Sequence, residues 1–143
     1  MAGELVPLVL LPRHTTLASL PDASSFFTTT AMDVTPYVTA IVTVWRGVVV
    51  GTSATSVSAP APPTFKVWFE ESTDQVVWSM CGGSPNGGDP GVATTSNPYK
   101  YGPGQHQFIV GLNKRWFRLK VQLYNANNVA SCYAVGYLER RLP

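Results

Sequence analysis

The chain has 143 residues, which is the usual size of one domain and is long enough to bury a core without a metal ion or a disulfide. Its formal net charge of +2 is too small for a general nucleic-acid binder, so we expect no nucleic-acid partner. Hydrophobic residues make up 45% of the chain and charged residues only 13%, about half the charged share of ordinary soluble domains. So few charges on so apolar a chain predict that part of the surface is covered by another molecule.

The first 21 residues are predicted to form an extended N-terminal arm ahead of a β-sandwich domain at residues 22–143. The segment Leu5–Pro12 is strongly apolar, but it is interrupted by proline and is too short for a good helix. We expect the arm to lie on its own domain or to add a strand to a neighbouring copy. No basic segment precedes these apolar residues, so a secretory signal is not predicted. No stretch is long and apolar enough for a membrane helix, so we expect no membrane partner.

The rest of the chain is predicted to form one short strand after another. The expected strands, in chain order, are Phe26–Thr30, Val38–Val50, Phe65–Glu71, Val76–Cys81, Gln105–Leu112, Arg115–Tyr124 and Ser131–Arg141. Polar turns or loops rich in glycine and proline separate them at Gly51–Pro63, Ser72–Gln75, Gly82–Gly104 and Asn125–Asn128. Apolar and polar residues alternate in two of these strands, which indicates sheets with one buried face. The sequence therefore predicts an all-β fold, an antiparallel, jelly-roll-like β-sandwich with an extended N-terminal arm.

Four segments follow one another in a recognisable order. They are DVTPY at Asp33–Tyr37, FKVWFEESTDQVVW at Phe65–Trp78, RWFRLKVQL at Arg115–Leu123 and YAVGYLERR at Tyr133–Arg141. In this order they resemble the small β-sandwich structural proteins of tailed-phage virions. The pattern covers roughly residues 26–141. It departs from the family at Gln75, where the usual turn has glycine, and in its longer loop of glycine and proline.

The resemblance implies a virion structural protein of a bacteriophage, located on the capsid surface. Proteins of this kind act as capsid decoration (cement) proteins, which bind the outer head surface and stabilise the lattice. The expected partner is the major capsid protein. We also expect a homo-oligomer, for which a trimer is favoured.

No residue pattern predicts catalysis, so we do not expect an enzyme. The two histidines lie in no motif, and Glu70 and Glu71 are adjacent on a strand, so they point to opposite faces. No cofactor and no metal site is predicted. Cys81 and Cys132 belong to no CxxC motif, and we favour two free thiols over a disulfide between them.

The candidate partner-binding residues are apolar or aromatic. They are Leu5, Val6, Leu8, Val9, Leu10 and Leu11 in the arm, together with Trp68 and Trp116 on the polar faces of their strands. Removing residues 1–20 is expected to abolish binding and leave the sandwich folded. The late cluster of Lys and Arg is either a set of solvated strand faces or a basic face that meets an acidic partner.

Two alternatives to the decoration protein remain open. Exposed tryptophans stack on sugar rings, so the chain is alternatively a carbohydrate-binding β-sandwich module with a glycan as partner. The second alternative is a tail or tail-fibre component of the same fold class.

Overall fold

The computed structural model describes residues 3–20, 25–51, 65–88, 90, 103–123 and 128–142. Sheet A has the order β1 (Leu5–Ala18), β10 (Asn128–Arg140), β4 (Tyr37–Arg46) and β8 (Gly104–Gly111), with β5 (Val50–Gly51) also paired to β10. Sheet B has the order β2 (Ser25–Thr28), β9 (Trp116–Leu123), β6 (Phe65–Ser72) and β7 (Ser79–Met80), with β3 (Met32–Asp33) also paired to β9. The described residues include no helix, and therefore none that is long and apolar enough to cross a membrane.

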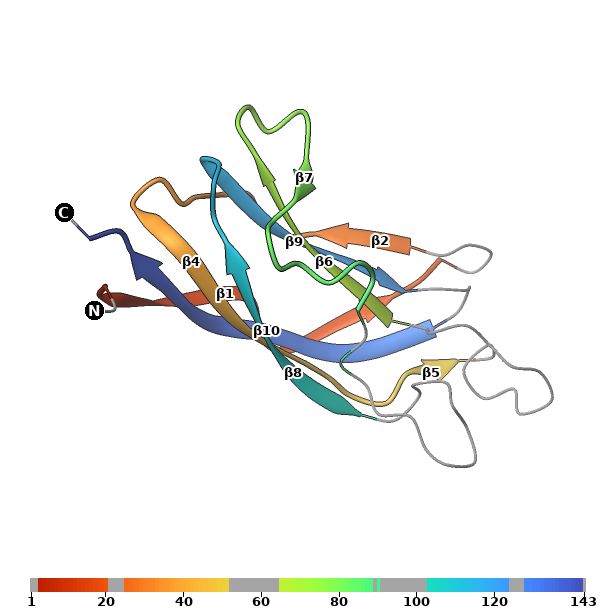
Figure 1. Ribbon diagram of the computed structural model, residues 1–143. Coiled ribbons are helices and arrows are strands. Elements are labelled where there is room, and N and C mark those ends of the chain that lie inside the picture. Colours follow the sequence, from red (N-terminus) through yellow and green to blue (C-terminus); the bar gives the residue numbers. More distant parts are fainter. Residues whose placement is uncertain are drawn as a thin grey trace.

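The two sheets pack against each other as an antiparallel β-sandwich, shown in Figure 1. The chain passes back and forth between the sheets, so that β1, β10, β4 and β8 lie in one layer and β2, β9, β6 and β7 in the other. This nested order is that of a jelly roll, which has eight main strands in two sheets. The all-β, jelly-roll-like sandwich predicted from the sequence is therefore confirmed. Both termini lie at the same end of sheet A, where the Arg140 N–H donates to the Glu4 carbonyl at 2.8 Å.

The segment expected to be a separate arm is the edge strand of sheet A. β1 pairs with β10 from Leu5, opposite Glu139, to Ala18, opposite Val129. Its extended conformation agrees with the prediction, but the boundary expected at residue 21 does not separate this strand from the sandwich. The reason is burial, because β1 contributes apolar side chains to the core.

Strand β1, which forms one edge of sheet A, is irregular. Its pairing with β10 shifts register between Val9 and Leu11 and again between Leu11 and Thr15. Within the second shift His14 has a φ of 70°, and the Thr15 hydroxyl donates to the Pro12 carbonyl at 2.6 Å. Bulges and prolines disfavour the pairing of a further strand with a sheet edge. The structure therefore disfavours strand addition by β1 to a neighbouring copy.

The core combines small side chains from sheet A with large ones from sheet B. Sheet A contributes Leu8, Leu10, Ala40, Val42, Val44, Val110, Ala130, Cys132, Ala134 and Leu138. Sheet B contributes Phe65, Val67, Phe69, Phe117, Leu119, Val121 and Leu123. The Phe69 and Phe117 rings stack at 6.1 Å between centroids, and Phe69 also meets Phe108 of sheet A at 5.5 Å. Small residues that face large ones allow the two sheets to pack closely.

Two predicted strands are shorter than expected. Val38–Val50 was expected to be continuous, but β4 ends at Arg46 and the chain turns before β5 pairs with β10. The Arg46 side chain is buried at this point, and its Nη1 donates to the Gly47 carbonyl at 3.2 Å. In Val76–Cys81 only β7 is a strand, because the preceding residues belong to a wide turn. Most of the loops expected at Gly51–Pro63, Gly82–Gly104 and Asn125–Asn128 lies outside the described residues.

The polar turn predicted after β6 is confirmed. The Ser72 hydroxyl oxygen accepts hydrogen bonds from the Asp74 and Gln75 N–H groups at 3.2 and 2.9 Å. Asp74 Oδ1 accepts from the N–H groups of Val76 and Val77 at 2.8 and 3.0 Å, and these bonds lower the pKa of Asp74. Gln75 has a φ of 62°, in the left-handed region that favours glycine. The departure from the family pattern noted at this position thus has a conformational cost.

The two sides of β1 give opposite predictions for stability. Leu8→Ala is expected to lower the free energy of unfolding by about 3 kcal/mol, because Leu8 is 2% exposed and its removal leaves a cavity. Leu5→Ala is expected to cost less than about 1 kcal/mol, because Leu5 is 48% exposed. Urea denaturation of both variants measures the difference. If the two substitutions lowered the free energy of unfolding equally, the assignment of β1 to the core would be wrong. A variant that lacks residues 1–20 and still unfolds in a cooperative, native-like transition would also contradict this assignment.

Gln75→Gly is expected to stabilise the protein by about 0.5–1 kcal/mol, because glycine adopts the left-handed conformation without a Cβ clash. Thermal unfolding should show a higher Tm. The matched control is Val76→Gly in the same turn, which has no positive φ to relieve and should not stabilise. An unchanged or lower Tm for Gln75→Gly would show that this backbone conformation carries no strain.

Candidate functional site

The structure divides the predicted partner-binding residues among several environments. In β1, Leu8 and Leu10 lie in the core and Val6 and Leu11 are half-buried at its margin. Leu5 and Val9 lie on the outward face of sheet A. Trp68 and Trp116 lie on the outward face of sheet B. Leu8 and Leu10 therefore do not form a contact surface, which corrects the expectation for the arm. The alternation along β1 turns them inward, and the sequence does not show which side of an isolated strand is inward.

The outward face of sheet B gathers aromatic rings and cations. We call it the cation–aromatic face, and it consists of Phe26, Glu70, Trp68, Trp78, Arg115, Trp116, Arg118 and Lys120. Strand register brings these residues together, since Trp68 of β6 lies opposite Lys120 of β9 and Glu70 lies opposite Arg118. The alternation of residues along the strands predicted the outward position of Trp68 and Trp116.

Lys120 lies between two rings of this face. Its Nζ is 4.7 Å from the centroid of the Trp68 ring and 5.6 Å from that of Phe26. The two rings are 6.2 Å apart, and Trp68 Nε1 donates to Asn86 Oδ1 at 3.1 Å. A cation over a ring face within about 6 Å is attracted by the electrons of that face. Trp68 is thus held by a hydrogen bond at its edge and by a cation over its face.

Glu70 binds two cations of the face at once. Its Oε1 lies 2.9 Å from Arg118 Nη2, and its Oε2 lies 3.4 Å from Lys120 Nζ. Glu70 is only 7% exposed, so these ion pairs are screened less by water than pairs on an open surface. The Arg118 guanidinium also lies 3.9 Å from the centroid of the Trp78 ring. One carboxylate thereby orders two cations and, through them, two tryptophan rings.

The DVTPY segment supports the far end of the same face. Asp33 accepts hydrogen bonds from the Thr35 N–H at 3.1 Å and from the Thr35 hydroxyl at 2.6 Å. Its other oxygen lies 3.0 Å from Arg115 Nε, and the Arg115 guanidinium lies 5.0 Å from the centroid of the Trp116 ring. The Thr35 hydrogen bonds, and then Arg115, lower the pKa of Asp33. This turn therefore orients a third pair of cation and ring.

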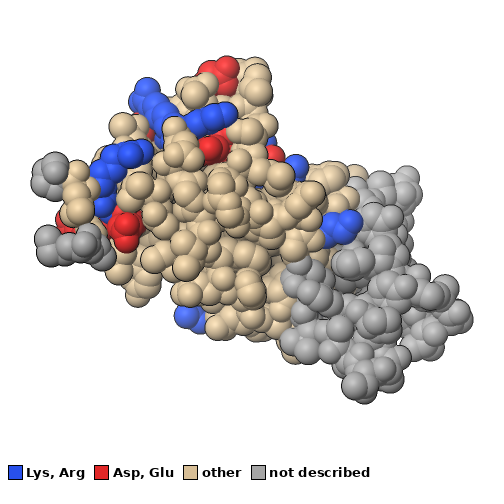
Figure 2. Space-filling model, viewed as in Figure 1, with Lys and Arg blue, Asp and Glu red and all other residues tan. Residues whose placement is uncertain are grey.

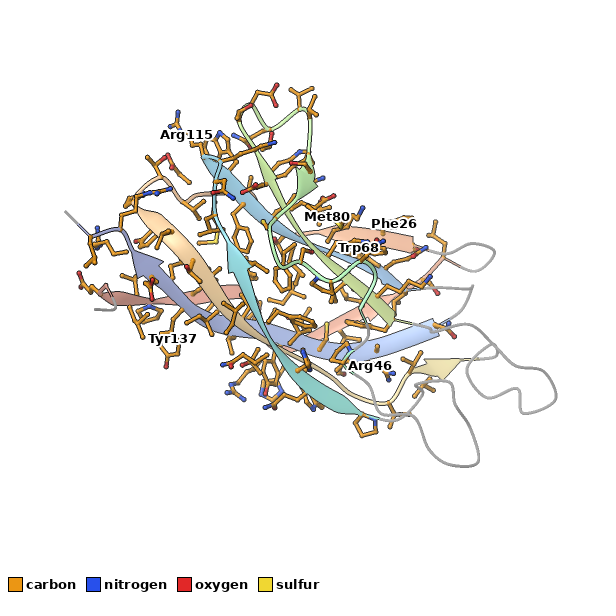
Figure 3. All side chains as sticks on the ribbon, in the orientation of Figure 1. Phe26, Arg46, Trp68, Met80, Arg115 and Tyr137 are labelled. Atoms are coloured by element: carbon orange, nitrogen blue, oxygen red, sulfur yellow. The ribbon has the colours of Figure 1, made fainter. Side chains whose placement is uncertain are left out.

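The outward face of sheet A has a different character. We call it the apolar face, and its central residues are Pro7, Val9, Ile41, Thr43, Gln107, Ile109, Val135 and Tyr137. The register places Pro7, Tyr137, Ile41 and Ile109 in one row across the sheet. Figure 3 shows Tyr137 directed away from the sandwich, on the side opposite to Phe26 and Trp68. The sequence analysis did not single out Ile109, although this residue falls on the outward side of a strand.

Two shallow hollows lie on this face. The first, of about 360 Å³, is lined by Pro7, Leu8, Val9, Arg13, Thr43, Val135, Gly136 and Tyr137. The second, of about 540 Å³, is lined by Arg13, His14, Thr16, Trp45, Ser131 and Tyr133. Arg13 belongs to both, and its guanidinium lies 4.6 Å from the centroid of the Tyr133 ring, which stacks on Trp45 at 5.5 Å. The bulge in β1 directs Arg13 over this end of the face.

Charged side chains are unevenly distributed over the molecule. Figure 2 shows blue and red side chains gathered mainly at the upper left of the view, and a broad area of uncharged residues across the middle. The low charged fraction of the sequence thus corresponds to whole areas without charge. Scattered single apolar residues are common on protein surfaces, whereas a large contiguous apolar area marks an interaction site.

Glu71 and the two thiols lie outside both faces. Glu71 Oε2 accepts from the N–H groups of Asn113 and Lys114 at 2.9 and 3.3 Å, so it binds the turn before β9. Cys81 and Cys132 are free and buried, as favoured from the sequence. In the part of the chain that the structure describes, no group of three or more His, Cys, Asp or Glu side chains could hold a metal ion.

In comparisons with models of known protein families and with curated proteins, nothing matches this chain.

Both thiols are expected to resist alkylation in the folded protein. Burial raises the pKa of Cys81 to about 12, with a further contribution from Glu71, and burial raises the pKa of Cys132 to about 11. Because the thiolate is the reactive form, iodoacetamide at pH 8 should modify neither residue before unfolding and both in denaturant. Mass spectrometry of the intact protein measures this. Rapid native modification of either residue would show that its thiol is accessible.

Proposed function

We propose that this protein is a virion structural protein, a capsid decoration protein that binds the outer head surface of a bacteriophage through its cation–aromatic face. The partner is the major capsid protein. One observation carries the proposal: a single sheet face combines Trp68, Trp78 and Trp116 with Arg115 and Arg118. Tryptophan and arginine are the residue types that dominate binding energies at protein interfaces.

The order within this face supports a binding role. Glu70 holds Arg118 and Lys120, and the cations in turn lie over the rings of Trp78 and Trp68. Side chains that are already ordered lose less rotamer entropy when a partner covers them. The face is therefore organised before binding.

The charge of the face suggests the chemistry of the partner. Its arginines and lysine outnumber the carboxylates of Glu70 and Asp33 that pair with them. A surface with a positive excess favours an acidic partner and accelerates association with it. We infer that the cation–aromatic face meets an acidic patch of the capsid lattice. A protein that binds only the assembled lattice stabilises that lattice by mass action.

Two analogies support the proposal that the protein belongs to a virion. The sequence pattern resembles that of tailed-phage structural proteins, and jelly rolls occur in viral capsid domains and in lectins. Fold likeness alone does not establish function. The surface chemistry favours a protein partner over a sugar, because a cation already lies over the rings of Trp68 and Trp116 and a sugar ring would compete with it.

Trp68→Ala is expected to weaken binding to empty phage heads by about 30-fold, which corresponds to a loss of about 2 kcal/mol at an interface hot spot. Trp68→Phe is the matched control, because it keeps a ring beneath Lys120, and it should retain most of the affinity. Co-sedimentation of the purified protein with heads measures the affinity. The binding should also weaken as salt rises, because exposed charges are screened.

Other outcomes would contradict the proposal. Unchanged binding of Trp68→Ala and Trp116→Ala to heads would exclude the cation–aromatic face as the contact surface. Binding to isolated tails but not to heads would favour the tail component. A change of tryptophan fluorescence with glycans that disappears in Trp68→Ala would favour the carbohydrate-binding module.

A further inference from the structure

We propose that a second copy of this chain covers the apolar face, and that a two-fold axis relates the two copies. The axis lies in the plane of the face and runs across the strands, so that β10 of one copy lies antiparallel over β10 of the other. This dimer uses sheet A only, and it is independent of the lattice contact proposed for sheet B.

The first support is exposed apolar area in the middle of the face. Val9 is 58% exposed, Ile109 is 61% exposed and Tyr137 is 50% exposed, and the half-buried Ile41 and Val135 lie between them. Neighbouring strands bring these residues together in two adjacent rows. A contiguous apolar area with a polar margin has the arrangement of a protein interface.

The second support is the placement of two charges. Among the described residues, Glu139 is the only carboxylate for which no hydrogen bond or ion pair is found, and Arg13 is the only cation without a polar partner. Both belong to the outward face of sheet A, Arg13 over Tyr133 at one end and Glu139 on β10 at the other. Every other Lys, Arg, Asp and Glu side chain in the described ranges has a hydrogen bond or an ion pair within the chain. These two remain for a partner.

The spacing of the two charges fits a two-fold axis. Tyr133, beneath Arg13, precedes Glu139 by six residues on β10, which corresponds to about 20 Å along a strand. An axis midway between them passes between the rows of Val135 and Tyr137. It places Glu139 of the second copy over Tyr133 and within reach of Arg13, and it repeats this contact at the other end. One interface therefore forms two ion pairs and buries the apolar rows between them.

The third support is shape. The same axis places Tyr137 of one copy opposite Val135 of the other. Val135, Val9 and Arg13 line the hollow of about 360 Å³. A protruding ring thus meets a hollow, and the reciprocal contact forms at the same time, as in any isologous interface.

This layout differs from the trimer favoured by the sequence analysis. A three-fold axis makes heterologous contacts, in which one patch meets a different patch of the next copy. Here both charges of the expected pair lie on one face, at equal distances from its centre. Such a self-complementary patch fits a two-fold pair.

Charge reversal and charge exchange test the dimer. Sedimentation velocity of the full chain should give the dimer mass for the wild type, and Arg13→Glu and Glu139→Arg should each raise the dissociation constant at least tenfold. The double variant R13E/E139R should restore the dimer, because exchange of the two charges rebuilds both ion pairs. The matched control is Arg115→Glu, which makes the same change of charge on sheet B and should leave the dimer mass unchanged.

The other results overturn the proposal. The first is a wild-type protein that stays monomeric or forms a trimer at concentrations up to about 100 μM, where even a weak dimer would be detected. The second is a dimer whose dissociation constant neither charge reversal changes. The third is a double variant that stays monomeric. Near-UV circular dichroism verifies that each variant is folded. Where a reversal prevents folding, Tyr137→Ala decides in its place: loss of the dimer supports the interface, and an unchanged dissociation constant overturns it.

Discussion

The pairing of β10 along both of its edges is the constraint on which the rest of the structure depends. β1 pairs with one side of this strand, and β4 and β5 pair with the other, so only β8 of sheet A does not contact it directly. At its centre, a Cβ on Gly136 would collide with the Ile41 carbonyl oxygen, so only glycine allows the observed approach of β4. Inward residues of β10 enter the core, and outward residues such as Tyr133 and Tyr137 form the middle of the apolar face.

The two outward faces differ in how their apolar and aromatic side chains are exposed to solvent. Sheet B carries large rings, and it covers them with cations that Glu70 and Asp33 hold in place. Sheet A exposes apolar side chains with few charges, and it keeps Arg13 and Glu139 at opposite ends. The first arrangement is stable in water and, in the function proposed above, it meets an acidic surface. The second gains free energy when apolar area is removed from water.

The alternation of residues predicted which way side chains point only where a strand has a clear period. It placed Trp68 and Trp116 outward, and the structure confirms both positions. In β1 the same reasoning stopped at an extended segment, because the outward residues Leu5 and Val9 are as apolar as the inward residue Leu8. The division between inward Leu8 and outward Val9 depends on pairing with β10, more than a hundred residues away. Gln75 was recognised as unusual, but only the backbone showed that its φ is positive.

The sequence by itself determined the all-β class, the positions of most strands, the turn after β6 and the preference for free cysteines. These are local properties, set by residue type and by a period of two. Tertiary structure alone decided the membership of residues 5–18 in sheet A, the cation–aromatic network around Glu70 and the common face of Arg13 and Glu139. The physical reason is that jelly-roll pairing joins strands far apart in the chain, and no local pattern encodes which strands become neighbours. The low charge seen at the outset is thus explained by one sheet face that pairs its charges and another that is almost without them.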